Sequence, residues 1–146
     1  MIQVIVGSKG CGKTARLVDD LNMQANSVGA NVVCIESGRR LDRMVKYKIR
    51  LVDITEYPVK TYPELLSFIG GISAKDYDLT HIYIDSITKV IQDPELCGDR
   101  PEYSNLADFL RQLDAFSDKN NFKVMIILSA DPAGLPEGLS KYCCTY

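Results

Sequence analysis

The chain has 146 residues, of which 46% are hydrophobic and 25% charged, and its formal net charge is -2. This length suits one compact domain, and this composition excludes a disordered or fibrous chain. The small negative charge argues against a protein that coats nucleic acid through bulk electrostatics, although a local basic patch is compatible with it. We therefore expect a single domain over residues 1–146 that binds small molecules or proteins.

The sequence indicates a cytoplasmic protein without a membrane partner. No apolar run reaches the roughly 20 residues that cross a bilayer, and the first residues predict a strand and a glycine loop instead of a signal peptide. Five cysteines suit reduced thiols better than a disulfide framework. Cys143 and Cys144 would point to opposite faces of a strand, so we expect no shared metal site there.

The N-terminal part predicts a strand, a glycine loop and a helix. An apolar run over residues 2–6 stops at Gly7, and apolar residues recur at helical spacing over residues 15–28. A second apolar run, residues 31–35, ends in Glu36. Two buried strands with a helix between them are therefore expected in this part of the chain.

The middle of the chain starts with a basic stretch, residues 39–50, that we expect to be helical in part. Residues 52–54 predict a short strand. Thr61 with Glu64 three residues later predicts a helix start, because the two side chains can satisfy free N–H groups reciprocally. We expect this helix to end near the glycine pair at 70–71.

The second half of the chain predicts four further elements and one loop. In chain order they are the buried strand His81–Ile84, a loop over residues 92–103, an amphipathic helix with apolar residues from 106 to 116, a strand over residues 122–128, and a last short strand within residues 142–146. Apolar strands separated by helices are typical of a parallel sheet covered on both faces. We predict an α/β fold with three layers and a mainly parallel five-stranded sheet.

Residues 7–14 read GSKGCGKT and match the phosphate-binding pattern G-x-x-x-x-G-K-[ST] between a predicted strand and a predicted helix. The glycines let the backbone wrap closely around an anion, and the loop N–H groups face the phosphates. Lys13 would contact the β- and γ-phosphates, and the Thr14 hydroxyl would bind Mg²⁺. The sequence predicts that ATP, or a close nucleoside triphosphate, is held by Gly7, Ser8, Lys9, Gly10, Cys11, Gly12, Lys13, Thr14 and Ala15.

Two simpler interpretations of this loop exist. The first is a glycine-rich turn that holds no ligand, which the flanking strand and helix argue against. The second concerns Cys11, which is either a redox-sensitive thiol beside the phosphates or a small side chain that fills the position. The small side chain is the simpler explanation.

A second metal ligand is expected at the end of a buried strand, because Mg²⁺ needs an oxygen ligand across from the loop hydroxyl. Asp85 follows the strand His81–Ile84 and supplies that carboxylate. Alone, it would be interpreted as an aspartate that caps the following turn. Beside the glycine-rich loop, Thr14 and Asp85 together predict a Mg²⁺ site.

Hydrolysis also requires a group that orients the attacking water, and Ser86 follows Asp85 where many such ATPases have a glutamate. Glu36 ends another strand at the same edge of the sheet, so we assign the catalytic role to Glu36, with Lys13. The alternative is a solvated strand-end acid. Ser129 is a candidate sensor of the γ-phosphate, against a simple cap before the following turn.

The order of these motifs resembles the core of RecA-type ATPases: GSKGCGKT, a strand ending in CIES followed by GRRLD, then YIDSI, then MIILS. The chain is also similar to a group of small P-loop proteins from Firmicutes that are often labelled twitching-motility-like. The resemblance implies a RecA-like strand order, a catalytic carboxylate at Glu36 and a central strand that ends in Asp85. The chain is much shorter than RecA and the motility ATPases, so filament formation, motility and strand exchange are not carried over.

We therefore expect Mg²⁺-dependent ATP binding with slow or partner-activated hydrolysis. A basic residue of the 39–50 stretch acting in a neighbouring subunit would imply a homo-oligomer or an activating protein, whereas a solvated surface is the simpler explanation. One alternative is a small-molecule or nucleotide kinase, with Asp93 or Glu95 as acid-base candidates. Another is a nucleotide-dependent module that binds nucleic acid or a protein through residues 39–50 and 92–103.

Overall fold

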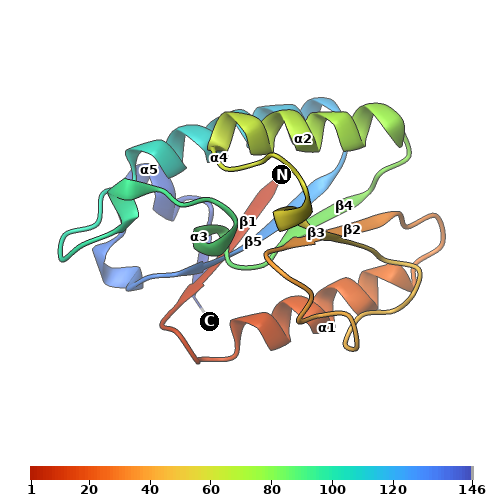
Figure 1. The fold of residues 1–146 in the computed structure, drawn as a ribbon, viewed down its shortest axis with the longest axis horizontal. Helices are drawn as coiled ribbons and strands as arrows, with labels where there is room; N and C mark the ends of the chain where they lie inside the picture. The colour runs from red at the N-terminus through yellow and green to blue at the C-terminus, as the bar shows by residue number, and fades with distance from the viewer. Residues whose placement is uncertain (146) are drawn as a thin grey trace.

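The computed structural model describes residues 1–145, and within them six strands form one parallel sheet (Figure 1). The strands are β1 (Ile2–Gly7), β2 (Val32–Glu36), β3 (Arg50–Asp53), β4 (His81–Ile84), β5 (Lys123–Ser129) and β6 (Cys143–Thr145), in the order β3-β2-β4-β5-β1-β6. The prediction of five strands is wrong by one, because β6 pairs with β1 with Val4 opposite Cys143. Tyr146, the end of the expected last strand, lies outside the described residues.

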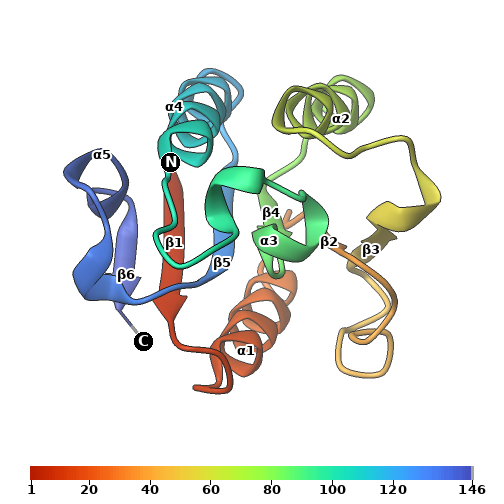
Figure 2. The same cartoon turned by 60° about the vertical axis from the view of Figure 1, so that its left-hand side comes forward.

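Helices cover both faces of this sheet, which makes three layers (Figure 2). The helices are α1 (Lys13–Ala25), α2 (Tyr62–Lys75), α3 (Ile87–Val90), α4 (Ser104–Lys119) and α5 (Glu137–Ser140), with short 3-10 turns at Ile54–Glu56, Pro94–Leu96 and Pro132–Gly134. Residues of α2 and α4 belong to one hydrophobic core with one face of the sheet, and residues of α1 belong to a second core with the other face. Cys143 packs against the first core and Cys144 against the second, so these two side chains do lie on opposite faces.

The start of α2 is the reciprocal cap that the sequence predicts. The Thr61 side chain accepts from the backbone N–H of Glu64, and the Glu64 carboxylate accepts from the backbone N–H of Thr61. The helix continues past the glycine pair to Lys75. A Cβ atom at Gly70 would lie 3.8 Å from the Phe116 ring of α4, an ordinary van der Waals contact, so the helix continues here without a steric need for glycine.

The basic stretch after β2 forms turns, so the expectation of partial helix is wrong. The N–H groups of Met44 and Val45 both donate to the Leu41 carbonyl, and the chain then turns toward β3. Leu41 and Ile49 are buried, whereas most residues between them are exposed. A short helix in water needs an apolar face to pack, and this segment has too few apolar residues to provide one.

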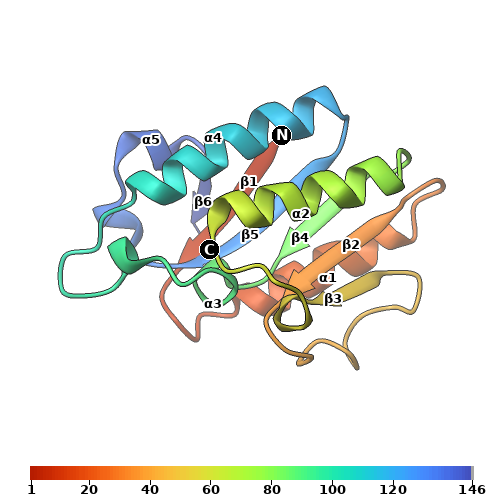
Figure 3. The same ribbon diagram turned by 45° about the horizontal axis from the view of Figure 1, so that its top comes forward.

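All neighbouring strands are parallel, so the loops that follow β1, β2, β4 and β5 emerge at one edge of the sheet. The short helix α3 lies at this edge, directly after β4 (Figure 3). Ligands of open α/β sheets bind at the carboxyl ends of the strands. Among the described residues, no helix is long and apolar enough to span a membrane.

Candidate functional site

The loop between β1 and α1 has a backbone path that requires glycine. Gly10 has φ 86° and Gly12 has φ 91°, the left-handed region that other residues rarely adopt. A Cβ atom on Gly7 would lie 2.7 Å from the Cys11 sulfur. Cys11 thus fills the inside of the loop against Gly7, which fits a small packing side chain. The loop closes at Gly12, the N-cap of α1, and so directs the first N–H groups of that helix toward the same edge of the sheet.

The Lys13 side chain turns back under this loop and is buried, with 5% of its surface exposed. Its ammonium donates to the Ser8 carbonyl at 2.6 Å and lies 3.7 Å from the Cys11 sulfur. None of the ion pairs within residues 1–145 includes Lys13. A buried ammonium without an anion is costly, so this position favours an anionic ligand.

The Asp85 side chain connects the start of α1 with the segment that follows β2. It is fully buried; Oδ1 accepts from the Thr14 hydroxyl at 3.1 Å, and Oδ2 lies 3.4 Å from the Arg40 guanidinium. The backbone N–H of Asp85 donates to the Ile35 carbonyl of β2, which holds the end of β4 in place. Ser86 follows with φ 56°, a conformation that costs energy for a residue other than glycine and turns the chain into α3.

Glu36 is buried at the end of β2, with 1% of its surface exposed. Its Oε2 accepts from the backbone N–H of Leu41 at 3.2 Å, whereas Oε1 is buried and has no hydrogen-bond partner within residues 1–145. Burial raises the pKa of this carboxyl, the charge of Asp85 raises it further, and the N–H groups of Leu41 and Arg40 oppose the shift. Glu36 thus keeps one acceptor oxygen unused beside the Asp85 carboxylate.

A cleft of about 530 Å³ opens at this edge of the sheet. It is lined by Lys9, Gly10, Gly12, Lys13, Thr14, Arg40, Ser86, Thr88, Lys89, Ile127 and Ser129. Four of these side chains are cationic: Lys9, Lys13, Arg40 and Lys89. The cleft is therefore suited to a multiply charged anion.

The structure places the residues that the sequence singled out around one cleft, but only some of them line it. Lys13, Thr14 and Ser129 line the cleft, while Asp85 and Glu36 lie buried behind that lining. Arg40 and Lys89 also line it, and the sequence did not assign them to this site. In the sequence, the only indication for Lys89 was its position four residues after Asp85. Arg40 could not be distinguished from the other five cations of residues 39–50.

The oxygen donors of the cleft suit Mg²⁺ only together with a ligand. Among residues 1–145, no group of three or more histidine, cysteine, aspartate or glutamate side chains is arranged to hold a metal ion. Thr14 and Asp85 provide two oxygens that lie together. Mg²⁺ commonly takes one or two protein oxygens and completes its coordination with phosphate and water, so this pair fits a nucleotide-bound ion.

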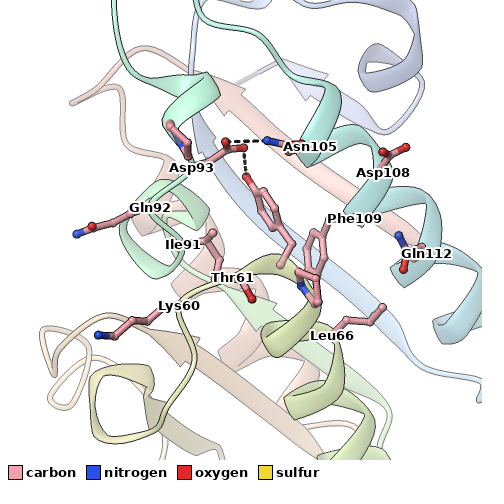
Figure 4. Close-up of a pocket in the computed structure, with 13 residues that line it drawn as sticks. Lys60, Thr61, Leu66, Ile91, Gln92, Asp93, Asn105, Asp108, Phe109 and Gln112 are labelled. Carbon is pink, nitrogen blue, oxygen red and sulfur yellow. Dashed lines mark hydrogen bonds between the residues drawn. The ribbon is translucent and has the colours of Figure 1, made fainter.

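A second cavity, of about 390 Å³, lies between α2, α4 and the segment after α3 (Figure 4). Asp93 forms part of its wall and is 4% exposed. Its Oδ2 accepts from the Tyr62 hydroxyl at 2.8 Å, and its Oδ1 accepts from the Asn105 amide at 3.2 Å and from the Glu95 N–H at 3.0 Å. Asp93 thus connects the loop to both helices.

The basic stretch divides its cations among different partners. Arg39 pairs with Glu56 and Asp42, and the Lys46 ammonium donates to Asn26 of α1. Arg40 is the one that reaches the cleft among the cations of residues 39–50. Tyr47, in the same stretch, is 94% exposed. The predicted contact of this stretch with nucleic acid or a protein stays a prediction.

No protein-family model matches the chain, and no curated protein matches it. The interpretation of the cleft therefore depends on its own residues.

Proposed function

We propose that this chain binds Mg²⁺ and a nucleoside triphosphate, with ATP as the main candidate, and hydrolyses it slowly as a P-loop NTPase. The observation that carries this proposal is the buried Lys13 ammonium, which lies under a glycine-rich loop without a carboxylate partner in residues 1–145. A triphosphate would supply the missing negative charge. The same loop would surround it with backbone N–H groups at the start of α1.

Thr14 and Asp85 are the residues that would hold Mg²⁺. When bound, the ion neutralises charge on the β- and γ-phosphates and orients them. The bond between the Thr14 hydroxyl and Asp85 at 3.1 Å supports this assignment, since two oxygens from distant parts of the chain converge.

Glu36 is the residue that would orient the attacking water. The Oε1 atom of this buried carboxylate has no protein donor within the described residues. This observation supports the role, because an unused acceptor can hold a water. The raised pKa of Glu36 brings it closer to the pH at which a general base works best. Ser129 lines the cleft and would contact the terminal phosphate.

The RecA-like interpretation has limited support from the topology. β4, which leads to Asp85, lies inside the sheet between β2 and β5, as the resemblance implies. The kinase alternative is weaker, because both of its candidate bases already accept protein donors. Asp93 accepts three in a different cavity, and Glu95 accepts from the Ser104 hydroxyl and the Asn105 N–H. Hydrolysis without a separate acceptor is therefore the preferred reaction.

The test is calorimetric titration of the chain with ATP, with and without Mg²⁺, together with a measurement of phosphate release. Lys13→Ala removes the ammonium from the loop, and we expect affinity to fall by about 2–5 kcal/mol, or at least roughly 30-fold. Lys75→Ala, at the last residue of α2, is the control and should bind as the unaltered chain does. Equal binding by both variants, or no binding by the unaltered chain at any Mg²⁺ concentration, would refute the proposal.

A further inference from the structure

Arg40 is the cation that contacts the predicted metal ligand. Its Nη2 lies 3.4 Å from Asp85 Oδ2, while Thr14 uses the other oxygen, Oδ1. The Asp85 side chain is completely buried, whereas 55% of the Arg40 side chain is exposed. A long, half-exposed cation thus neutralises a buried carboxylate from the open side of the cleft.

We propose that Arg40 senses the γ-phosphate from within the same chain: it pairs with Asp85 when the cleft is empty and moves to the terminal phosphate when a Mg²⁺-nucleoside triphosphate is bound. This inference rests on the proposed function. It assigns to Arg40 the discrimination between a triphosphate and a diphosphate.

The first argument is electrostatic. Thr14 and Asp85 are the oxygens that suit Mg²⁺, so a guanidinium on Asp85 and a divalent cation would compete for one carboxylate. Two positive charges that share one carboxylate in a partly buried site repel each other, and a divalent ion doubles the repulsion that a monovalent one would cause. Arg40 is therefore expected to leave Asp85 when the metal site fills.

The second argument is mechanical, because the backbone next to Arg40 is fixed while its side chain is 55% exposed and paired only at its tip. The N–H of the next residue, Leu41, donates to buried Glu36, and Leu41 itself is 1% exposed. Glu36 thus holds the turn at Leu41, next to Arg40, and the Arg40 side chain can change partner without movement of the turn.

The third argument concerns the destination of the side chain. Arg40 lines the same cleft as Lys13 and Ser129. Mg²⁺ held by Thr14 and Asp85 would neutralise charge on the β- and γ-phosphates, so a group that starts beside Asp85 would stand near the terminal phosphate. A guanidinium forms two parallel hydrogen bonds with a phosphate, which gives it a strong preference for that group.

The neighbouring residue provides a matched control. Arg39 has a similarly exposed side chain, at 63%, but it pairs with Glu56 at 3.4 Å and Asp42 at 3.7 Å. It does not belong to the residues that line the cleft. Removal of either arginine changes the net charge equally, so a difference between the two variants reports position and not charge.

The experiment is calorimetric binding of Mg²⁺-ADP and of Mg²⁺ with a non-hydrolysable ATP analogue to the unaltered chain, Arg40→Ala, Arg40→Lys and Arg39→Ala. We expect Arg40→Ala to lower the triphosphate-to-diphosphate affinity ratio by at least about tenfold, with ADP affinity unchanged or increased because Asp85 is free. Arg40→Lys keeps the charge without the paired hydrogen bonds, so its ratio should fall less. Arg39→Ala should keep the original ratio.

The outcomes separate this inference from the proposed function. If Arg40→Ala binds both nucleotides with the original ratio, the inference fails while nucleotide binding stands. If the unaltered chain binds neither nucleotide, both fail. Because Arg40→Lys retains a cation beside Asp85, it also tests the idea where Arg40→Ala does not fold.

Discussion

A buried carboxylate lines the cavity between α2 and α4, and another lies behind the wall of the cleft beside the glycine-rich loop, but the acceptor atoms of the two are used differently. In the cavity between α2 and α4, the Asp93 carboxylate receives three donors, from Tyr62, Asn105 and the backbone of Glu95. Behind the wall of the cleft beside the glycine-rich loop, Glu36 keeps one buried oxygen without a donor among residues 1–145. Lys13 there is equally short of an anion in the described chain.

Under the proposed function, this difference distinguishes a carboxylate that stabilises the fold from groups that a ligand would complete. Buried polar groups are normally satisfied, so a satisfied one needs no further explanation. Unsatisfied ones cost stability and are expected where a ligand completes them. Substitutions in the first cavity should therefore reduce stability, and substitutions in the cleft should reduce binding or turnover.

The largest effect is expected for Glu36→Gln on phosphate release. The amide keeps an oxygen for the Leu41 N–H but cannot act as a base, so turnover should fall by about 10²–10⁴-fold with nucleotide affinity retained. Single-turnover phosphate release measures the rate, and calorimetry measures the affinity. A rate equal to that of the unaltered chain would remove Glu36 from catalysis, and loss of affinity as well would make its role purely structural.

The next effect in size is expected for Asp93→Ala on the free energy of unfolding. The Tyr62 hydroxyl and the Asn105 amide would lose their acceptor, and the cap of the turn Pro94–Leu96 would disappear, so we expect a loss of about 2–4 kcal/mol. Urea unfolding measures this loss. Asp108→Ala, at an exposed residue of the same cavity, should change stability by less than about 0.5 kcal/mol.

Nucleotide affinity adds a second test of the same variant. If the two cavities have the roles described above, folded Asp93→Ala should bind Mg²⁺-ATP as the unaltered chain does. A variant that keeps its stability but loses nucleotide binding would reverse the comparison and favour the kinase alternative.

A smaller effect is expected for Tyr62→Phe. The ring stacks on Phe109 with centroids 5.1 Å apart, and phenylalanine preserves that contact while the hydrogen bond to Asp93 is lost. We expect a loss of about 1–2 kcal/mol in urea unfolding. Tyr77→Phe, at a 94% exposed tyrosine, is the matched control, and an equal effect in both variants would show that the Asp93 bond adds no stability.

The features that were predictable from the sequence are those encoded by local patterns. The pattern around Gly7, Lys13 and Thr14 predicted a strand, a loop and a helix, and the structure has β1 and α1 there. The acids at the ends of β2 and β4 were also found, since each follows a short apolar run. The predicted chemistry of these residues stays a prediction.

The features that were missed depend on contacts between distant residues. Arg40 and Asp85 are 45 positions apart, and Tyr62 and Asp93 are 31 apart, so no local pattern reveals either pair. The fold of residues 39–50 was predicted wrongly for a related reason. Its conformation follows from the buried Glu36 carboxylate and from α1, which hold its backbone, and not from its own helix propensity.

The smallest effect is on the pH dependence of the free energy of unfolding. It tests whether the buried, charged Glu36 carboxylate destabilises the fold, as the comparison requires. Burial and the charge of Asp85 raise the pKa of Glu36 above its ordinary value, so the folded chain holds that proton more tightly than the unfolded chain. The resulting stabilisation is complete below the unfolded pKa, about 4.3, and is lost as pH rises through the higher folded pKa. Glu36→Gln does not titrate there, so its stability relative to the unaltered chain should increase from about pH 4 toward neutrality.

Urea unfolding of both proteins in the absence of nucleotide, at several pH values, measures this difference. Glu137→Gln replaces an exposed acid and should show no such trend. A difference that stays constant with pH would mean that Glu36 is as well accommodated as Asp93. In that case its unused oxygen would no longer distinguish the cleft from the cavity between α2 and α4, and the proposal would depend on Lys13 alone.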